Sequence, residues 1–393
     1  MLNTVFSPWP SFTHEEAEAV SAVLLSNRVN YWTGTETREF EKEFAAFADT
    51  DHAIAVANGT VALDLALKGL GIGVGDEVIV TSRTFLASAS SIVNAGATPI
   101  FADVDRDSQN ITAETVRPWV TERTKAIVAV HLAGWPCDMD SLNALAKAND
   151  LFVIEDCAQA HGATYKNKPV GGLGHVAAWS FCQDKIMSTG GEGGMVTTNS
   201  RELWSHMWSF KDHGKSWEAV YNREHPPGFR WLHESIGTNW RMTEMQAVIG
   251  RLQLKKMPDW SESRRAHCER IWAAASLYRG KGLRVPAVPA DIAHAGYKCY
   301  IFVEPSELKP GWDRDRIMAT IVARGVPCFS GSCSEIYLES CFQEAGLAPK
   351  SRLSVAKELG ETSLMFLVHP TLTSEEMDKT VQVLQRVMNE CSL

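Results

Sequence analysis

Short, continuously apolar runs that alternate with helix-length segments constrain the fold of this chain most strongly. Five such runs predict strands, at residues 53–57, 77–80, 98–104, 126–131 and 151–156. Three intervening segments have helical length and composition, at residues 60–70, 85–96 and 139–150. Strands that are apolar on both faces are typical of a mostly parallel sheet covered by helices on both sides. This part of the chain is therefore predicted to form a three-layer α/β domain.

A change in composition near residue 255 predicts a second domain. A charged stretch at residues 261–270 is followed by a proline-rich connection at 284–291. Beyond it the sequence predicts a strand, a helix and a terminal helix that begins after the capping box at Thr373. A chain of 393 residues is long enough for more than one core. We expect a large domain over residues 1–255 and a smaller α+β domain over residues 256–393.

The charge balance and the apolar pattern limit the kinds of partner. The formal net charge is -9, and the sequence contains no run rich in Lys or Arg that could hold a phosphate backbone. No apolar stretch reaches membrane-spanning length, and the N-terminus lacks the basic start and apolar centre of a signal peptide. We therefore expect a cytoplasmic protein that binds neither nucleic acid nor membrane.

The cysteines predict neither a disulfide framework nor a metal site. There are nine, an odd number, and they are scattered along the chain. Cys328 and Cys333 are the closest pair, but no CxxC or HxxxH pattern lies nearby to complete a zinc site. Reduced thiols and no bound metal are expected.

Three groups of polar residues follow predicted strands, where ligands bind in open α/β sheets. Asp156 ends one strand, and Ser180 lies near the end of an apolar run with Lys185 on the glycine-rich loop after it. Gly59 and Thr60 follow the first strand and begin a helix, so backbone N–H groups and a hydroxyl are offered to a phosphate. Each group has a plainer reading, since Asn-Gly-Thr also forms an ordinary turn with an N-cap and Asp156 could cap the next segment.

Taken together, these groups match the parts that a pyridoxal phosphate site requires. They are a phosphate anchor, a carboxylate for the pyridine nitrogen and a lysine amine for the Schiff base. The combination is harder to explain by local turn chemistry than any one of the three. The sequence thus predicts a pyridoxal 5'-phosphate enzyme.

Longer stretches around these residues resemble the signatures of the DegT/StrS-type sugar aminotransferases. The stretches are residues 155–171, 179–195 and 237–247, and the similarity extends through 57–67 and 83–89 over nearly the whole chain. The resemblance implies the aspartate aminotransferase fold, with a three-layer large domain and a smaller C-terminal domain. It also implies pyridoxal 5'-phosphate as the cofactor.

The resemblance implies roles for four residues around the cofactor ring. Lys185 would bind the cofactor as a Schiff base and then carry the proton between the cofactor carbon and the substrate carbon. Asp156 would pair with the pyridine nitrogen and keep it protonated, and Gln159 would contact the 3-oxygen. Phe85 would lie flat on the ring, with an ordinary core phenylalanine as the alternative reading.

The resemblance also implies how the phosphate of the cofactor is held. Gly59, Thr60 and Ser180 of one subunit would bind it. Asn239, in the third stretch, would reach the same phosphate from the other subunit. The active protein would then be a homodimer with two shared sites.

The reaction implied by the resemblance is transfer of an amino group from L-glutamate to a keto or aldehyde sugar. The usual substrate would be a nucleotide-linked keto-sugar for cell-surface glycans such as lipopolysaccharide. Cys182 and Ala133 depart from the family pattern near the site, so the substrate carries over less directly than the cofactor. A free oxidised sugar acid, such as an 8-oxo ulosonic acid, is the alternative substrate. Arg28, Arg230 and Arg241 are candidate partners for its carboxylate or for a diphosphate.

Three other functions fit the sequence less well. The dehydratases of the same family have histidine at the lysine position, which Lys185 opposes. A non-catalytic sensor would not need the lysine, the acid and the phosphate anchor together. A nicotinamide site at the glycine-rich residues 69–75 is excluded because they follow a helix and precede a strand. His131 and His161 are interpreted as satisfied core histidines, with a supporting role at the site as the alternative.

Overall fold

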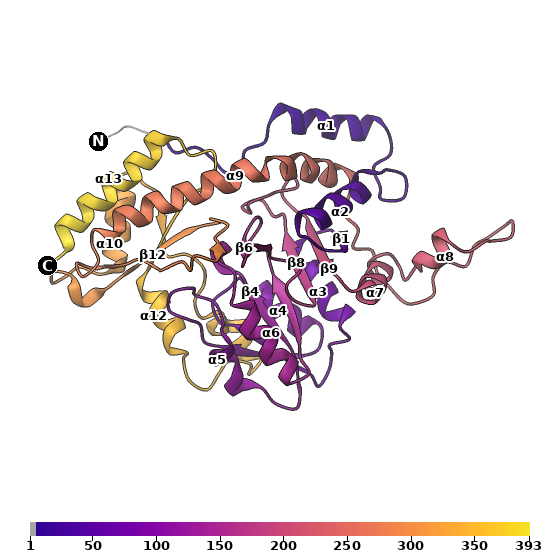
Figure 1. The fold of residues 1–393 in the computed structure, drawn as a ribbon, viewed down its shortest axis with the longest axis horizontal. Coiled ribbons are helices and arrows are strands. Elements are labelled where there is room, and N and C mark those ends of the chain that lie inside the picture. The colour runs from indigo at the N-terminus through magenta and orange to yellow at the C-terminus, as the bar shows by residue number, and fades with distance from the viewer. Residues whose placement is uncertain (1–4) are drawn as a thin grey trace.

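The computed structural model describes residues 5–393, and its centre is a seven-stranded sheet (Figure 1). The strand order is β1-β9-β8-β5-β4-β2-β3. Only β9 runs antiparallel to its neighbours β1 and β8. The bounds are β1 His52–Val56, β2 Glu77–Thr81, β3 Thr98–Ala102, β4 Thr124–Val130, β5 Phe152–Asp156, β8 Val176–Ser180 and β9 Gly194–Thr198. The prediction of a mostly parallel sheet is confirmed.

Helices cover both faces of this sheet because its strands are apolar on both sides. β2, β8 and β9 are buried along their whole length. The covering helices include α2 (Glu36–Phe47), which packs on β1, and α3 (Gly59–Gly69), which packs on β8 and β9. Two more of the expected helices are present as α4 (Ala87–Asn94) and α6 (Met139–Ala148). The three-layer architecture of this part is confirmed.

A second, antiparallel sheet follows in the C-terminal part, in the order β10-β12-β14-β13. Its core is an apolar cluster separate from that of the large sheet and includes Ile301, Leu364 and Leu384. Two helices pack in this part, α10 (Arg314–Ala323) and α13 (Ser374–Cys391). The strand bounds are β10 Leu283–Arg284, β12 Cys299–Val303, β13 Cys328–Phe329 and β14 Ser363–Phe366. This is the expected mixture of helices and an antiparallel sheet.

The long helix α9 (Glu244–Ser276) connects the two parts (Figure 1). Ala247 near its start packs in a cluster beside the large sheet, and Ile271 near its end belongs to the C-terminal cluster. The helix α1 (His14–Leu25) packs against it. The predicted division between residues 255 and 256 falls inside α9, and the placing of that boundary stays a prediction.

The remaining elements are short. They are α5 Ala113–Val116, α7 Arg201–Lys211, α8 Trp217–Tyr221, α11 Ser340–Glu344, α12 Ser354–Thr362, a small sheet of β6 Thr164–Tyr165, β7 Lys168–Pro169 and β11 Ile292–Ala293, and the 3-10 turns Arg117–Trp119, Leu132–Gly134, Pro305–Glu307 and Ile336–Leu338. Across residues 5–393, none of the helices combines the length and the apolar composition needed to cross a bilayer.

An excursion of the chain over residues 213–238, here called the arm, follows α7, includes α8 and projects from the body (Figure 1). A backbone bridge between Asp212 and Asn239 closes its base. Apolar side chains on the arm face solvent, since Trp231 is 81% exposed and Ile236 is 92% exposed. Large exposed apolar side chains that gather on one projection are typical of a surface that another chain covers.

Candidate active site

Seven of the eight predicted site residues line one cavity of about 670 Å³, here called the strand-end cavity. It lies at the carboxyl ends of β1, β5 and β8, where parallel strands finish at the same edge of the sheet. The seven residues come from four separate stretches of the chain: Gly59, Thr60, Phe85, Asp156, Gln159, Ser180 and Lys185. The fold therefore gathers side chains that the sequence holds more than a hundred positions apart.

The turn between β1 and α3 has the form of an anion cradle. Asn58 is the N-cap of α3, and its side chain accepts a hydrogen bond of 2.9 Å from the N–H of Val61. The N–H groups of Gly59 and Thr60 precede the first helical hydrogen bonds and stay available to a ligand. A side chain at residue 59 would collide with Ser180, because a Cβ there would lie 2.5 Å from the Ser180 Cβ. The turn is thus both an ordinary N-cap and a cradle for a phosphate.

Asp156 presents a buried carboxylate whose two oxygens are both oriented. Ser88 Oγ donates to Oδ2 at 2.7 Å, and the N–H of Ala158 donates to Oδ1 at 3.1 Å. Burial raises the pKa of Asp156, while the bonds from Ser88 and Ala158 and the charge of Lys185 lower it. The Ser88 hydroxyl in turn meets Thr84 Oγ1 at 2.8 Å. The carboxylate is held in one orientation, as a partner for a ring nitrogen requires.

Lys185 lies on the loop after β8 with its side chain 15% exposed. Its Nζ is 3.5 Å from Asp184 Oδ1 and 5.2 Å from the centre of the Tyr297 ring. The indole N–H of Trp9 donates a hydrogen bond of 2.8 Å to the Lys185 carbonyl and holds the loop. The amine is therefore fixed at the cavity wall, with a carboxylate beside it that the sequence reasoning did not identify.

Phe85 and Gln159 line the strand-end cavity beside these groups. Phe85 is 68% exposed, so the reading as an ordinary core phenylalanine is wrong. Its ring is free to cover a flat ligand. Gln159 accepts a hydrogen bond of 2.7 Å at Oε1 from the N–H of Ala133, which leaves its amide nitrogen as the donor toward the cavity.

Asn239 lies outside the strand-end cavity, at the base of the arm, where it is exposed. The three arginines also lie outside it. Arg28 and Arg230 are exposed, and the Arg241 guanidinium forms an ion pair of 2.6 Å with Asp212. Arg241 is thus engaged within its own chain, which makes it a poor partner for a substrate anion.

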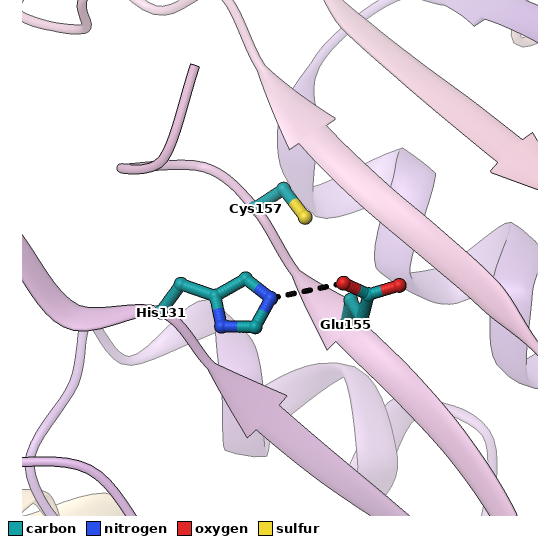
Figure 2. Close-up of side chains that lie close together, drawn as sticks. All are labelled: His131, Glu155 and Cys157. Atoms are coloured by element: carbon teal, nitrogen blue, oxygen red, sulfur yellow. Dashed lines mark hydrogen bonds and ion pairs between the residues drawn. The ribbon is translucent and has the colours of Figure 1, made fainter. Parts of the chain in front are cut away.

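His131, Glu155 and Cys157 lie close together at the ends of β4 and β5 (Figure 2). The Nε2 of His131 is 3.0 Å from Glu155, and its Nδ1 accepts from the N–H of Cys137 at 3.0 Å. Glu155 also accepts three backbone bonds from the loop at residues 171–174. These bonds engage both ring nitrogens of His131 and both carboxylate oxygens of Glu155, so the pair braces the loop.

His131 and His161 differ in the hydrogen bonding of their ring nitrogens. Both ring nitrogens of His131 are hydrogen-bonded, as expected of a core histidine. His161 is buried between Trp179 and Phe181, but neither ring nitrogen has a hydrogen-bond partner among residues 5–393. Burial lowers the pKa of His161 to about 3. It is therefore a neutral core histidine without the expected partners.

Several residues at the site were missed by the sequence reasoning. Tyr297 and Lys298 reach it from the C-terminal part and line an outer chamber of about 510 Å³. This outer chamber shares Phe85, Gln159 and Lys185 with the strand-end cavity, so the two spaces adjoin. No local pattern marks Tyr297 or Lys298, because they lie more than a hundred residues from Lys185. The hydroxyls of Thr84 and Ser88 flank Phe85 in the sequence, but Thr84 precedes α4, so no helical spacing pointed to the pair.

The cavity fits pyridoxal 5'-phosphate by shape and by charge. The cradle at Gly59 and Ser180 suits the phosphate, and the oriented carboxylate of Asp156 suits the pyridine nitrogen. When bound, this cofactor supplies an electron sink for the substrate carbon. A volume of about 670 Å³ is ample for the cofactor and part of a substrate.

Comparisons with known proteins identify the family of this chain. A model of the DegT/DnrJ/EryC1/StrS aminotransferase family matches residues 10–385. The X-ray structure of an aminotransferase from Psychrobacter cryohalolentis is 62% identical, covers 98% of this chain and 99% of its own, and has a TM-score of 0.97. The structure of S. venezuelae DesV in complex with a ketimine intermediate is 32% identical, covers 95% and 94%, and has a TM-score of 0.84. GDP-perosamine synthase of Caulobacter vibrioides is 37% identical over 89% of each chain. The chain belongs to the DegT/DnrJ/EryC1/StrS aminotransferase family.

Proposed function

We propose that this enzyme transfers an amino group from L-glutamate to the carbonyl carbon of a keto-sugar, with pyridoxal 5'-phosphate as cofactor. One observation carries the proposal. Lys185 and Asp156 line the same cavity from the loop after β8 and the end of β5, which are neighbouring strands. An amine and an oriented carboxylate on one side of a phosphate cradle are the groups that amino transfer on this cofactor uses.

Each of the residues that line the cavity has a separate role in the proposed reaction. With the cofactor bound, the Lys185 amine would hold it covalently and would carry the proton that the transfer of the amino group requires. Asp156, oriented by Ser88, would keep a proton on the ring nitrogen. Gly59, Thr60 and Ser180 would hold the phosphate. Phe85 would shield the ring from water.

The proposed active form is a homodimer in which Asn239 serves the partner's site. Its place at the base of the arm, outside its own strand-end cavity, supports this role. The exposed apolar side chains Trp231 and Ile236 on the arm support a second copy of the chain as the covering surface. A two-fold dimer would bury both arms and complete both sites.

The proposed acceptor is a nucleotide-linked keto-sugar used for cell-surface glycans such as lipopolysaccharide. The names of relatives support this class, since they include GDP-perosamine synthase and a dTDP-3-amino-3,4,6-trideoxy-alpha-D-glucose transaminase. A free oxidised sugar acid is the second candidate acceptor. The reaction would take place in the cytoplasm, where nucleotide-linked sugars are made.

Incubation with L-glutamate in the absence of any sugar tests the proposed activity. The cofactor-loaded enzyme should convert its cofactor to the pyridoxamine form and release one 2-oxoglutarate per site, which absorbance and product assay both report. A second amino acid, alanine, serves as the comparison donor. Failure with glutamate, glutamine and alanine alike, in protein that carries the cofactor, would refute amino transfer.

A further inference from the structure

A small pocket of about 180 Å³ adjoins the outer chamber close to Lys185 and is here called the side pocket. Its walls include Trp9, Arg264 and His369, and it shares Asp184 and Lys298 with the outer chamber. The shared wall places the side pocket within reach of a substrate that occupies the chamber. None of the functions assigned above uses Arg264, Lys298 or His369.

Lys298 lies at the junction of the side pocket and the outer chamber. Within residues 5–393 its amine makes no hydrogen bond and no ion pair, and it lies 4.8 Å from the centre of the Tyr297 ring. Burial lowers the pKa of Lys298 to about 8. The positive charges of Arg264 and Lys185 also lower this pKa, whereas the negative charge of Asp184 raises it. At pH 7 the group is still mostly an ammonium ion, so the junction holds a positive charge that Asp184 offsets in part.

Arg264 adds a second charge behind the same wall. Its guanidinium lies 4.9 Å from the Trp9 ring, and its Nη1 donates to the Gly296 carbonyl at 3.2 Å. Its Nε and Nη2 are buried and have no hydrogen-bond partner in the described part of the chain. Burial lowers the pKa of Arg264 to about 9, which leaves it charged at pH 7. A buried charge without a partner raises the electrostatic potential of the space beside it.

The remaining ionisable groups leave the side pocket positive. Asp184 is the one carboxylate among the described residues that line it, and Asp184 is already bonded to the Tyr297 hydroxyl at 2.5 Å and lies 3.5 Å from Lys185. His369 bonds to Thr371 through Nδ1, and burial lowers its pKa to about 4, so it is neutral at pH 7. The positive charges of Lys298 and Arg264 thus exceed the one negative charge of Asp184, which has other partners. The net charge of the pocket wall suits a ligand with a single negative charge.

We infer that the side pocket binds a carboxylate of one of the two substrates, with Lys298 contacting it and Arg264 stabilising it by charge. This rests on the proposed amino transfer. The size selects the class of anion, because pockets for larger ligands have volumes of about 300–1,000 Å³, whereas this one is about 180 Å³. A carboxylate with a short carbon chain fits, and a nucleoside diphosphate does not. The carboxylate belongs either to the amino donor or to a sugar acid acceptor.

Calorimetric binding to the cofactor-loaded enzyme tests the inference with two unreactive probes. Glutarate has the two carboxylates of glutamate without its amino group, and D-glucuronate is a sugar acid without a ketone. At least one of them should bind, and Lys298→Gln should weaken that binding about tenfold or more, as expected for loss of a charged hydrogen-bond donor. Lys298→Arg should retain it. Lys125→Gln, on the exposed side of β4, is the matched control and should leave it unchanged.

Arg264→Met provides a second variant, whose thermal unfolding shows whether it folds. If the variants lose binding of glutarate alone, the pocket is assigned to the amino donor. If they lose binding of D-glucuronate alone, it is assigned to the acceptor. Unchanged binding of both probes in Lys298→Gln overturns the inference. Guanosine diphosphate is measured as a third ligand, and a variant that weakens its binding but not that of either carboxylate also overturns the inference. Neither probe can donate an amino group, so a failure of binding is distinguishable from a failure of amino transfer.

Discussion

Ser88 donates a hydrogen bond of 2.7 Å to the Oδ2 atom of Asp156, and Thr84 lies 2.8 Å behind the same hydroxyl. Ser88 reaches the carboxylate from the first turn of α4, which begins directly after the loop that carries Phe85. The acid at the end of β5 is thereby oriented by a helix that follows β2. The orientation of Asp156 is a property of the folded sheet and is absent from the local sequence around it.

Ser88→Ala should narrow the pH range of activity from the acid side. The Ser88 bond lowers the pKa of Asp156, so its removal raises that pKa, and the carboxylate becomes protonated at a higher pH. The acid limb of the kcat profile should therefore move to higher pH while the alkaline limb stays in place. Ser90→Ala on the same helix is the control. Superimposable profiles for both variants and the unmodified enzyme would show that Ser88 does not tune the carboxylate.

Asp156→Asn should leave the cofactor bound but slow amino transfer by about two orders of magnitude or more. An uncharged amide cannot stabilise a protonated ring nitrogen, whereas the phosphate cradle and Lys185 are unaffected. Single-turnover kinetics with glutamate isolate the chemical step from binding. Near-normal rates in that experiment would contradict the role given to Asp156.

Mixing of two inactive variants tests the sharing of sites between subunits. Lys185→Ala removes the amine, and Asn239→Asp places a negative charge against the cofactor phosphate of the partner. A mixed dimer carries both lesions in one site and none in the other. With random pairing about half of the dimers are mixed, so about a quarter of the original activity should return after joint unfolding and refolding. Mixed dimers that form but stay inactive would place Asn239 outside the partner's site.

The parts of the fold and the site that depend on local pattern could be predicted from sequence. The runs at 126–131 and 151–156 became β4 and β5 because strands buried on both faces are continuously apolar. Asp156 and Lys185 were found because ligand sites in such sheets lie just beyond strand ends, and their cavity is where that rule places it.

The remainder depends on contacts between distant segments. Lys298 enters the outer chamber only because β12 and α9 bring the C-terminal part against the loop of Lys185, and no spacing along the chain records that approach. The change in charge near residue 255 suggested a boundary, yet α9 runs through it, since a long helix can pack its two ends in different cores. Phe85 could be read either way because an apolar residue in an apolar stretch carries no sign of its exposure.

Reduction of the cofactor-loaded enzyme with borohydride, followed by peptide mass mapping, tests the central claim that Lys185 holds the cofactor. The pyridoxyl adduct should lie on the peptide that contains Lys185. Lys185→Ala should lose both this adduct and the visible absorbance band while its circular dichroism stays unchanged. Lys298 is the competitor to examine, because it lines the same outer chamber as Lys185. A stable adduct on Lys298 or on any other lysine of the unmodified enzyme would contradict the account.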